Sequence, residues 1–282
     1  MAWIEDKRVV ITGATSGIGR EIAARLASLG AHVVLACRDG VRAEQVAADI
    51  AAGVGERRAA VMTVDVSDQA SVRAFAARYR DAYGTLDVLV NNAGVLLPDR
   101  QRSVDGIELT FATNVLGYYL VTTELLDALH AAAPARVVNV ASTFAFGLDL
   151  DDLQFDRRPY DGMTAYAQSK GCDRLLTWAL ARRLDPASVT VNAMAPGLVL
   201  DTSLYRHLTL EAKRELEQHG SRSITDGAET GVWLASSPDL DGVTGTFFEL
   251  AAEVGCELRD EDGEERLWQA CQQLAGHVAA NR

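Results

Sequence analysis

The sequence predicts an α/β protein built on one doubly wound, mostly parallel sheet of seven strands. Short runs of β-branched and apolar residues lack polar alternation, which is typical of strands that are buried on both faces of a sheet. Helical patterns separate these runs in strict alternation from residue 8 to residue 197, which indicates right-handed βαβ units. No Pro/Gly/Ser-rich linker divides the chain, so we expect a single domain over residues 1–282.

Each expected strand is a short apolar run, and each expected helix shows apolar residues at a period near 3.6. The strands are RVVITG (8–13), HVVLAC (32–37), AAVMTVD (59–65), LDVLVNNAG (86–94), ARVVNVAS (135–142), VTVNAMAPG (189–197) and GTFFEL (245–250). The helices are 17–29, 41–52, 71–83, 107–132, 164–184 and 226–236. A further helix over about 260–275 has Leu267, Trp268, Cys271 and Leu274 at helical spacing, which predicts that it docks on the domain.

A glycine-rich turn, TGATSGIG (12–19), directly follows the first strand and opens the first helix. Gly13, Gly17 and Gly19 permit a tight turn, close backbone approach to a pyrophosphate, and a helix N-terminus aimed at its charge. The turn lacks the Lys-Ser/Thr ending of a nucleotide triphosphate loop. It therefore favours a dinucleotide over ATP.

The second strand ends in LACRD (35–39), where an NAD-binding unit would place an acidic residue for the ribose 2′-hydroxyl. Cys37 stands at the strand end and Arg38 follows it. A guanidinium binds a 2′-phosphate with two parallel hydrogen bonds, whereas a carboxylate would repel it. Asp39 fits as the N-cap of the next helix. We therefore predict NADP(H) as the preferred coenzyme, with NAD as the alternative.

A tyrosine and a lysine stand four residues apart in AYAQSKG (165–171), at the start of a helical run. Tyr166 and Lys170 must share one helix face. An ammonium held near a phenol favours the phenolate and lowers the pKa of the phenol, so the pair could exchange a proton near neutral pH. Taken alone, the spacing also fits an ordinary surface pair.

Two stretches, 143–163 and 201–225, break the alternation of strands and helices. Both emerge at the carboxyl ends of strands, where open α/β sheets bind ligands, so we expect them to form the substrate pocket or a lid. In the first stretch we expect the apolar residues to face the pocket or protein body and the aspartates to be solvated. The apolar residues are Leu148, Leu150, Leu153 and Phe155, and the aspartates are Asp149, Asp151 and Asp152.

The overall charge and the cysteines exclude several classes of partner. A net charge of -12 argues against nucleic acid and against an anionic membrane surface. The four cysteines are scattered without ligand spacing, so we expect free thiols and no metal site. No signal peptide and no apolar run of about 20 residues stand out, and we expect a cytoplasmic protein.

Six motifs, taken in order, resemble those of the short-chain dehydrogenase/reductase family over about residues 8–250. They are TGATSGIG, NNAG (91–94), Asn114, Ser142, Tyr166 with Lys170, and Pro196-Gly197. The resemblance implies a single-domain Rossmann fold and a nicotinamide coenzyme. Three segments are similar to those of retinol-dehydrogenase-like and protochlorophyllide-reductase-like members, which act on bulky apolar substrates. These segments are LDLDDLQF (148–155), YAQSK and LWQACQQL (267–274).

The resemblance also implies a role for each matching residue. Tyr166 would be the general acid for carbonyl reduction or the base for alcohol oxidation, and Lys170 would lower its pKa and bind the nicotinamide ribose. Ser142 would bind the substrate oxygen, and Asn114 would hold a water that links Lys170 to solvent. Asp65 would contact the adenine, although it also fits as a helix cap. The implied coenzyme contacts are Gly13, Thr15, Ser16, Gly17, Ile18, Gly19, Arg38, Asp65, Val66, Asn92, Ala93, Gly94, Tyr166, Lys170, Pro196, Gly197, Val199 and Thr202.

The sequence departs from the family pattern after the lysine and after the sixth strand. Gly171, Cys172 and Asp173 replace the usual apolar, small and amide residues, which places a charge on that helix. Asp201 stands where a threonine is usual, and Thr202 follows one position later. These departures leave the substrate open, including whether it is a retinoid.

The sequence thus favours an NADP(H)-dependent oxidoreductase that interconverts a carbonyl and an alcohol on an apolar small molecule. Two alternatives stay open: a non-catalytic dinucleotide sensor and a sugar-nucleotide epimerase or dehydratase. Sensors tend to lose the tyrosine or the lysine, and epimerases usually carry a TGxxGxxG turn and a longer substrate domain. The helices after residues 106 and 164 often form a dimer or tetramer core in the family, so a homodimer or homotetramer is a further expectation.

Overall fold

Eight strands form one sheet in the order β3-β2-β1-β4-β5-β6-β7-β8 in the computed structural model, which describes residues 3–218 and 220–276. The neighbours from β3 to β7 pair in parallel. Because the strand order reverses between β1 and β4, the carboxyl ends of the strands open a crevice there. The strands are β1 (Arg8–Thr12), β2 (His32–Cys37), β3 (Ala59–Thr63), β4 (Val88–Asn91), β5 (Ala135–Val140), β6 (Val189–Ala195), β7 (Phe247–Glu249) and β8 (Ala252–Glu253).

The predicted doubly wound α/β fold is confirmed, but the predicted count of seven strands is wrong by one. The eighth strand, β8, pairs antiparallel with β7. Leu250 and Ala251 adopt φ angles of 53° and 54°, and this left-handed pair reverses the chain directly after β7. A two-residue strand is too short to leave a periodic pattern in the sequence, so only the pairing reveals it.

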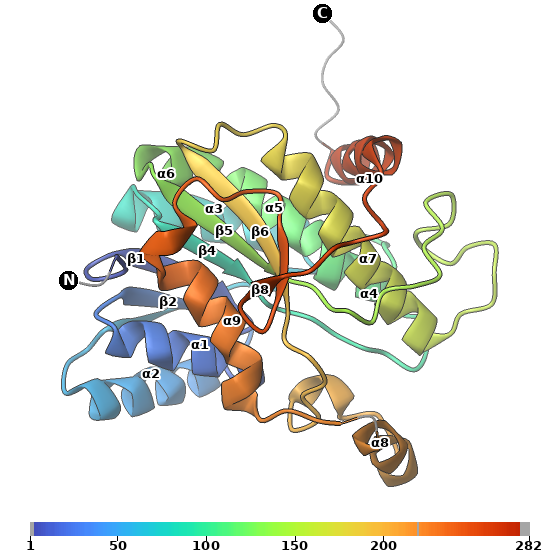
Figure 1. Cartoon of the computed structure of the whole chain (residues 1–282), viewed down its shortest axis with the longest axis horizontal. Helices are drawn as coiled ribbons and strands as arrows, with labels where there is room; N and C mark the ends of the chain where they lie inside the picture. Colours follow the sequence, from blue (N-terminus) through green and yellow to red (C-terminus); the bar gives the residue numbers. More distant parts are fainter. Residues whose placement is uncertain (1–2, 219, 277–282) are drawn as a thin grey trace, which may run out of the picture.

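Helices cover both faces of the sheet, with α1, α2 and α9 on one side and α3, α5, α6 and α7 on the other (Figure 1). The helices that the sequence predicts are present with ends that differ by a few residues, except that the one predicted over 107–132 is divided into segments. The α-helices are α1 (Gly17–Ser28), α2 (Gly40–Val54), α3 (Gln69–Tyr83), α4 (Leu109–Phe111), α5 (Gly117–Glu124), α6 (Leu126–Ala131), α7 (Gly162–Ala181), α8 (Leu210–Glu217), α9 (Ile224–Ser236) and α10 (Glu261–Leu274). The shorter turns are η1 (Ala112–Leu116), η2 (Ser203–Tyr205) and η3 (Pro238–Leu240).

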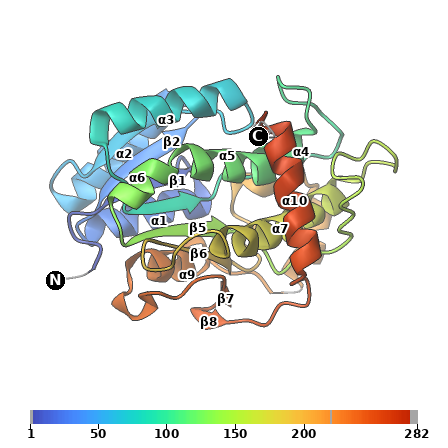
Figure 2. The same cartoon turned by 90° about the horizontal axis from the view of Figure 1, so that it is seen from above.

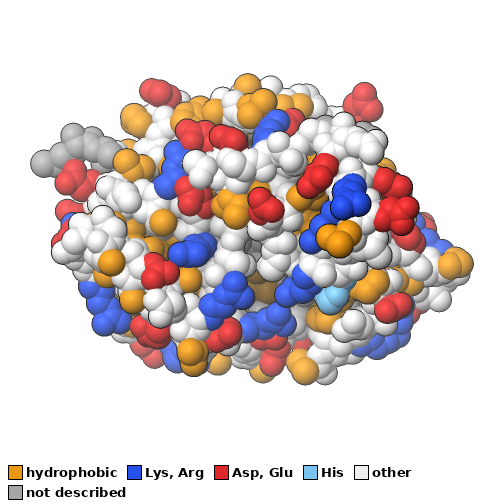
Figure 3. Space-filling model, turned by 90° about the horizontal axis from the view of Figure 1, so that it is seen from below, with side chains coloured by type: hydrophobic (Ala, Val, Ile, Leu, Met, Phe, Trp, Pro, Cys, Tyr) orange, Lys and Arg blue, Asp and Glu red, His pale blue; other side chains and the backbone are white. Residues whose placement is uncertain are grey.

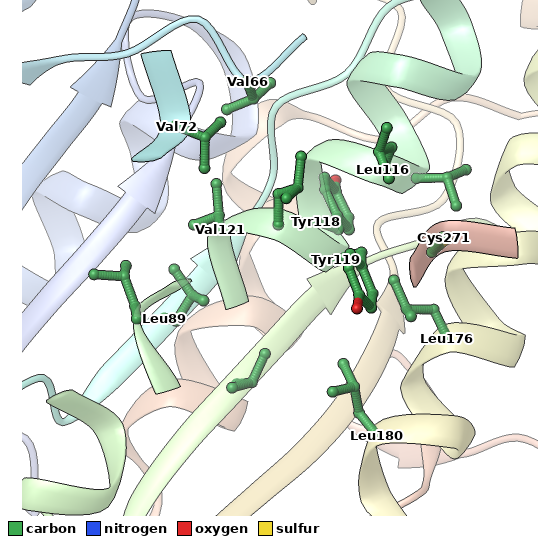
Figure 4. Close-up of a cluster of buried hydrophobic side chains, with 14 of the residues drawn as sticks. Val66, Val72, Leu89, Leu116, Tyr118, Tyr119, Val121, Leu176, Leu180 and Cys271 are labelled. Atoms are coloured by element: carbon green, nitrogen blue, oxygen red, sulfur yellow. The ribbon is translucent and has the colours of Figure 1, made fainter. Parts of the chain in front are cut away.

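Two hydrophobic cores lie on the two faces of the sheet. Neighbouring residues of β1 divide between them, since Val10 belongs to one core and Val9 and Ile11 belong to the other. This is why the strands lack polar alternation. Figure 4 shows the first core, where Tyr118 and Tyr119 of α5 lie among side chains from α7, α10 and the sheet.

The helix predicted over 107–132 is present over 109–131, but it contains a π-helical turn and is interrupted at Leu125, neither of which was expected. Residues 112–116 form a π-helical turn, η1, between α4 and α5. The buried Asn114 lies in this turn and exchanges two hydrogen bonds with the backbone of Val95. Its amide also donates to Ser169 Oγ of α7 at 2.9 Å. These contacts come from distant segments, so the periodicity of 107–132 could not show the π-helical turn.

Helix α10 packs across α7 and α5, as Figure 2 shows. Leu267 and Cys271 are fully buried, and the Trp268 ring lies edge-on to Tyr119 with centroids 5.0 Å apart. The Arg183 guanidinium lies over the Trp268 ring, 4.4 Å from its centroid. The apolar spacing of the C-terminal segment thus corresponds to a buried helix face.

Asp152 is buried, which corrects the expectation that the aspartates of 143–163 are all solvated. Its carboxylate accepts hydrogen bonds from the backbone N–H groups of Asp156, Arg157 and Arg158. Burial alone would raise the pKa of Asp152, but these N–H groups lower it below its usual value. The carboxylate therefore holds a chain reversal together. Leu153 and Phe155 are buried beside it, as predicted.

Helix α7, which carries the Tyr–Lys motif, begins with the N-cap Asp161. Its carboxylate accepts hydrogen bonds from Thr164 N and Thr164 Oγ1 at 2.8 and 2.7 Å. The Asp161→Ala substitution is expected to lower the free energy of unfolding by about 1 kcal/mol near pH 7, because the cap is lost. Urea unfolding measured at several pH values checks this.

The pH dependence of that loss follows from the same contacts. The hydrogen bonds from Thr164 lower the pKa of Asp161 in the folded chain. The stabilisation is therefore present above the unfolded value of about 3.9, and it disappears as the pH falls through the folded value. Asp81→Ala, at an exposed position inside α3, is the matched control, with an expected change within about 0.5 kcal/mol. Equal losses in the two variants would contradict the capping role.

Two kinds of feature are absent from the part of the chain that the structure describes. No helix there is long and apolar enough to cross a membrane. No cluster of three His, Cys, Asp or Glu side chains there could hold a metal ion. Within those same residues all four cysteines are free thiols.

Candidate active site

A groove with a volume of about 360 Å³ lies at the carboxyl ends of the central strands. Figure 3 shows the face below the sheet, where several Lys and Arg side chains gather around a hollow. Most of the residues predicted to bind a coenzyme line this groove. They are Gly13, Thr15, Ser16, Gly17, Ile18, Gly19, Arg38, Asp65, Val66, Asn92, Ala93, Gly94, Tyr166, Lys170, Pro196 and Thr202.

The glycine-rich turn touches the NNAG segment closely enough to require glycine. A Cβ on Gly13 would lie 2.8 Å from Ala93 Cα, and a Cβ on Gly19 would lie 2.3 Å from Asn92 Nδ2. Asn92 Nδ2 donates to the carbonyl oxygens of Thr12 and Gly13. Thr12 Oγ1 in turn accepts from the backbone N–H groups of Asn92 and Ala93. Asn92 and Ala93 therefore shape the turn as well as lining the groove.

The N-terminus of α1 opens into the groove, and its first backbone N–H groups have no partner within the helix. The N-cap residue Ser16 makes no capping bond, and its hydroxyl lies 3.3 Å from Ser203 Oγ. Gly17 has a φ of 55°, and a Cβ there would lie 3.0 Å from Thr202 Cγ2. The segment after β6 thus passes directly over the turn, and a helix N-terminus of this kind is suited to a phosphate.

Two arginines, Arg38 and Arg42, line the groove beyond the end of β2. Arg38 is exposed, and its Nη1 lies 3.7 Å from Asp65 Oδ2. The other carboxylate oxygen of Asp65 accepts bonds from Ser67 N and Ser67 Oγ, so Asp65 also shapes its own loop. Asp39 caps α2 by accepting from Arg42 N, as predicted. Sequence reasoning missed Arg42, which lies in the first turn of α2.

Tyr166 and Lys170 both line the groove, with only 7% and 4% of their surfaces exposed. Lys170 Nζ lies 5.8 Å from the centroid of the Tyr166 ring and 5.2 Å from that of Tyr118. It donates to the carbonyl oxygen of Val140 and to Asp173 Oδ2, each at 2.8 Å. The surface-pair reading of the motif is therefore wrong.

Burial raises the pKa of Tyr166 well above its usual value, and Tyr205 and Asp173 raise it further. This direction is opposite to the lowering that the sequence pattern suggested for the lysine. Burial also raises the pKa of Asp173 to about 6, and the Lys170 ammonium opposes part of that rise. The positive charge of Lys170 therefore has a carboxylate partner that the pattern Tyr-x-x-x-Lys does not reveal.

Ser142 and Asn114 lie next to the groove but are not part of its lining. Ser142 Oγ accepts a hydrogen bond from Phe144 N at 2.9 Å. The carbonyl oxygen of Ser142 accepts from Nε of Arg174 at 3.0 Å and also from its Nη2. The Arg174 guanidinium packs over the Phe247 ring at 4.1 Å. Sequence reasoning missed Arg174, because nothing local shows that it reaches the end of β5.

Two further predicted contacts, Gly197 and Val199, also lie outside the lining. A Cβ on Gly197 would meet the Arg222 guanidinium at 2.8 Å. Val199 is buried, and its Cγ2 would lie 2.6 Å from a Cβ on Gly227 of α9. The Val199 side chain therefore packs against α9. Ser203, Leu204 and Arg206, which follow in the same segment, line the groove. The sequence predicted that residues 201–225 form part of the pocket, but it did not single out these three.

Comparison with known proteins identifies the family. The family model described as short chain dehydrogenase matches residues 7–213. The chain belongs to the short-chain dehydrogenase/reductase family. The predicted relationship to its retinol-dehydrogenase-like members is confirmed by the relatives below.

Three similar members of the family come from bacteria and a mammal. A probable oxidoreductase of Streptomyces antibioticus is 39% identical and aligns over 94% of this chain and 96% of its own. Retinol dehydrogenase 12 of Mus musculus is 38% identical over 97% of this chain and 87% of its own. The crystal structure of a 3-ketoacyl-(acyl-carrier-protein) reductase from Brucella melitensis, complexed with NADH, is 30% identical in sequence. Its TM-score is 0.69, and the match covers 89% of this chain and 98% of the reductase. The chain is thus an oxidoreductase of this family.

Proposed function

We propose that this short-chain dehydrogenase uses NADP(H) to interconvert a carbonyl and an alcohol on an apolar small molecule. One observation carries the proposal: a buried tyrosine and a buried lysine line the same groove as a glycine-rich turn and the arginines Arg38 and Arg42. The relatives of this chain are named as oxidoreductases, retinol dehydrogenases and a ketoacyl reductase. A carbonyl or alcohol substrate agrees with those names.

The groove fits a dinucleotide on the chemistry of its own residues. The glycine turn leaves space that a Cβ would fill, and the N-terminus of α1 presents N–H groups to a pyrophosphate. Arg38 and Arg42 would hold a 2′-phosphate, because guanidinium groups match phosphate oxygens in pairs. Lys170 has one N–H left after its two bonds and would bind a ribose hydroxyl. When bound, the coenzyme supplies or accepts a hydride.

The proton of the reaction would come from Tyr166, the titratable hydroxyl in the groove beside Lys170. Its raised pKa keeps the phenol protonated at neutral pH, which suits a general acid in carbonyl reduction. Ser142 would bind the substrate oxygen, since a hydroxyl that accepts from Phe144 N can still donate its own hydrogen. Asn114 does not line the groove, so its effect would be indirect, through the π-helical turn that holds its amide against Ser169.

The apolar class of substrate is supported by two phenylalanines that follow β5. Phe144 and Phe146 pack edge-on with centroids 4.8 Å apart, yet their side chains stay 38% and 48% exposed. Exposed aromatic pairs of this kind favour binding of an apolar ligand. They lie in the chain two and four residues after Ser142, next to the proposed reaction site.

A panel of apolar aldehydes, ketones and secondary alcohols, followed by the absorbance of NADPH, tests the proposal. We expect turnover with at least one apolar carbonyl and much slower turnover with small hydrophilic ones. Coenzyme binding without turnover of any carbonyl or alcohol would favour the dinucleotide sensor. Conversion of a sugar nucleotide without net change in NADPH would favour the epimerase. Either result would overturn the proposed function.

A further inference from the structure

The carboxylate of Asp173 lies one helical turn beyond Lys170 on α7 and meets its ammonium. Lys170 Nζ and Asp173 Oδ2 are 2.8 Å apart, and the side chains are 4% and 0% exposed. Pairs three residues apart on a helix are usually solvated and contribute little. This pair is removed from water inside the active-site region. Its electrostatic effect on neighbouring groups is correspondingly stronger.

The second oxygen of Asp173 marks the pair as unusual. Asp173 Oδ1 is buried and has no hydrogen-bond partner among the residues that the structure describes. Buried carboxylates normally satisfy both oxygens, because an unpartnered one is costly. The carboxylate thus has Lys170 as its partner, and its burial costs free energy of desolvation. This pattern is more typical of a functional group than of a stabilising one.

Among residues 3–218 and 220–276, the other titratable groups around the pair carry no positive charge that could replace Lys170. The Arg174 guanidinium is directed away, toward the Ser142 carbonyl oxygen and Cys256 Sγ. The groups that face Asp173, Lys170 or Tyr166 are Tyr118 of α5, Cys172 of α7, Cys271 of α10 and Tyr205 of η2. Phenols and buried thiols are neutral near pH 7. The local charge is therefore set by Lys170 and Asp173 together.

A lone lysine beside a phenol favours the phenolate, whereas a lysine with a buried carboxylate partner has much of its field cancelled. We propose that Asp173 is a positioning residue for Lys170: it fixes the ammonium and offsets its charge, so that Tyr166 keeps its proton to higher pH. The proposal rests on the proposed role of Tyr166 as acid and base. It assigns a function to the aspartate that stands where the family usually has an amide.

The Asp173→Asn variant keeps the size of the side chain and an acceptor for Lys170 but removes the charge. Alcohol oxidation needs the phenolate, so its rate rises with pH as Tyr166 ionises. In Asp173→Asn this rise is expected to move to lower pH by about one unit, the shift typical of a nearby charge. The alkaline fall of carbonyl reduction moves in the same direction. A purely structural role for Asp173 would lower the rates without moving either profile.

Cys172→Ala is the matched control, because Cys172 is the equally buried and uncharged neighbour of Asp173. Its pH profiles are expected to coincide with those of the wild type. Unchanged profiles in a folded Asp173→Asn variant would overturn the proposal. So would an equal shift in Cys172→Ala.

A second measurement on the wild type does not depend on the stability of the aspartate variant or on turnover. The ultraviolet absorbance of tyrosinate is followed from pH 6 to pH 11, and the spectrum of Tyr166→Phe is subtracted. We expect the contribution of Tyr166 to appear only above about pH 9, since a phenol without a net positive neighbour ionises near 10. Tyrosinate of Tyr166 near pH 7 would overturn the proposal. A failed substrate panel would instead overturn the proposed function and leave this titration readable.

Discussion

Replacing Tyr166 with Phe is expected to lower turnover by about 100- to 10,000-fold, the usual contribution of a general acid or base. The change removes the transferable proton and almost no volume, and Tyr166 is only 7% exposed in the wall of the groove. Coenzyme affinity is expected to stay nearly intact. Steady-state rates with the best substrate of the panel and a fluorescence titration of NADPH check the two parts separately.

Tyr83→Phe is the matched control for this result. Tyr83 lies at the end of α3, does not line the groove, and packs against Tyr79 with ring centroids 5.0 Å apart. Removing its hydroxyl is expected to leave turnover unchanged. If Tyr166→Phe retained most of its activity, the proposed mechanism would be wrong, even with the family established.

Arg38→Leu is expected to remove most of the preference for NADPH over NADH. Hydrogen bonds to charged groups contribute about 1.5–3 kcal/mol, or about 10- to 150-fold in affinity, so the wild type should prefer NADPH by more than about tenfold. In the structure Arg38 lines the groove with its Nη1 3.7 Å from Asp65 Oδ2, and its side chain is exposed, so a phosphate could reach it. Titration of both coenzymes against both proteins measures the effect.

Two further variants sharpen the coenzyme test. Arg57→Leu is the matched control, because Arg57 is an exposed arginine that also lies 3.7 Å from a carboxylate, that of Glu44, but outside the groove. It is expected to leave both affinities unchanged. Cys37→Asp is expected to strengthen NADH binding through the ribose hydroxyls and to weaken NADPH. Equal affinity of the wild type for both coenzymes would falsify the NADP assignment while leaving the oxidoreductase assignment standing.

The sequence by itself determined the fold class and the place of the proposed coenzyme groove. Strand and helix periodicity depends on neighbours along the chain, so the seven parallel strands and the helices between them could be predicted. The glycine turn was predictable because its glycines directly follow a strand and open a helix, which is a local pattern. Only the structure shows that Ala93 and Asn92 are what a side chain on Gly13 or Gly19 would meet. Tyr166 and Lys170 share a face because helix geometry alone places them there.

Tertiary structure alone decided the charges and contacts around those residues. Lys170 has a buried partner in Asp173, Arg174 reaches the carbonyl of Ser142, and Asp152 is buried under three backbone N–H groups. The π-helical turn at Asn114 likewise depends on contacts with distant segments. Periodicity does not record such contacts, because they form between groups brought together only by packing. The pKa of a buried group follows from that packing, which is why a sequence motif indicated the proposed catalytic pair but not its electrostatics.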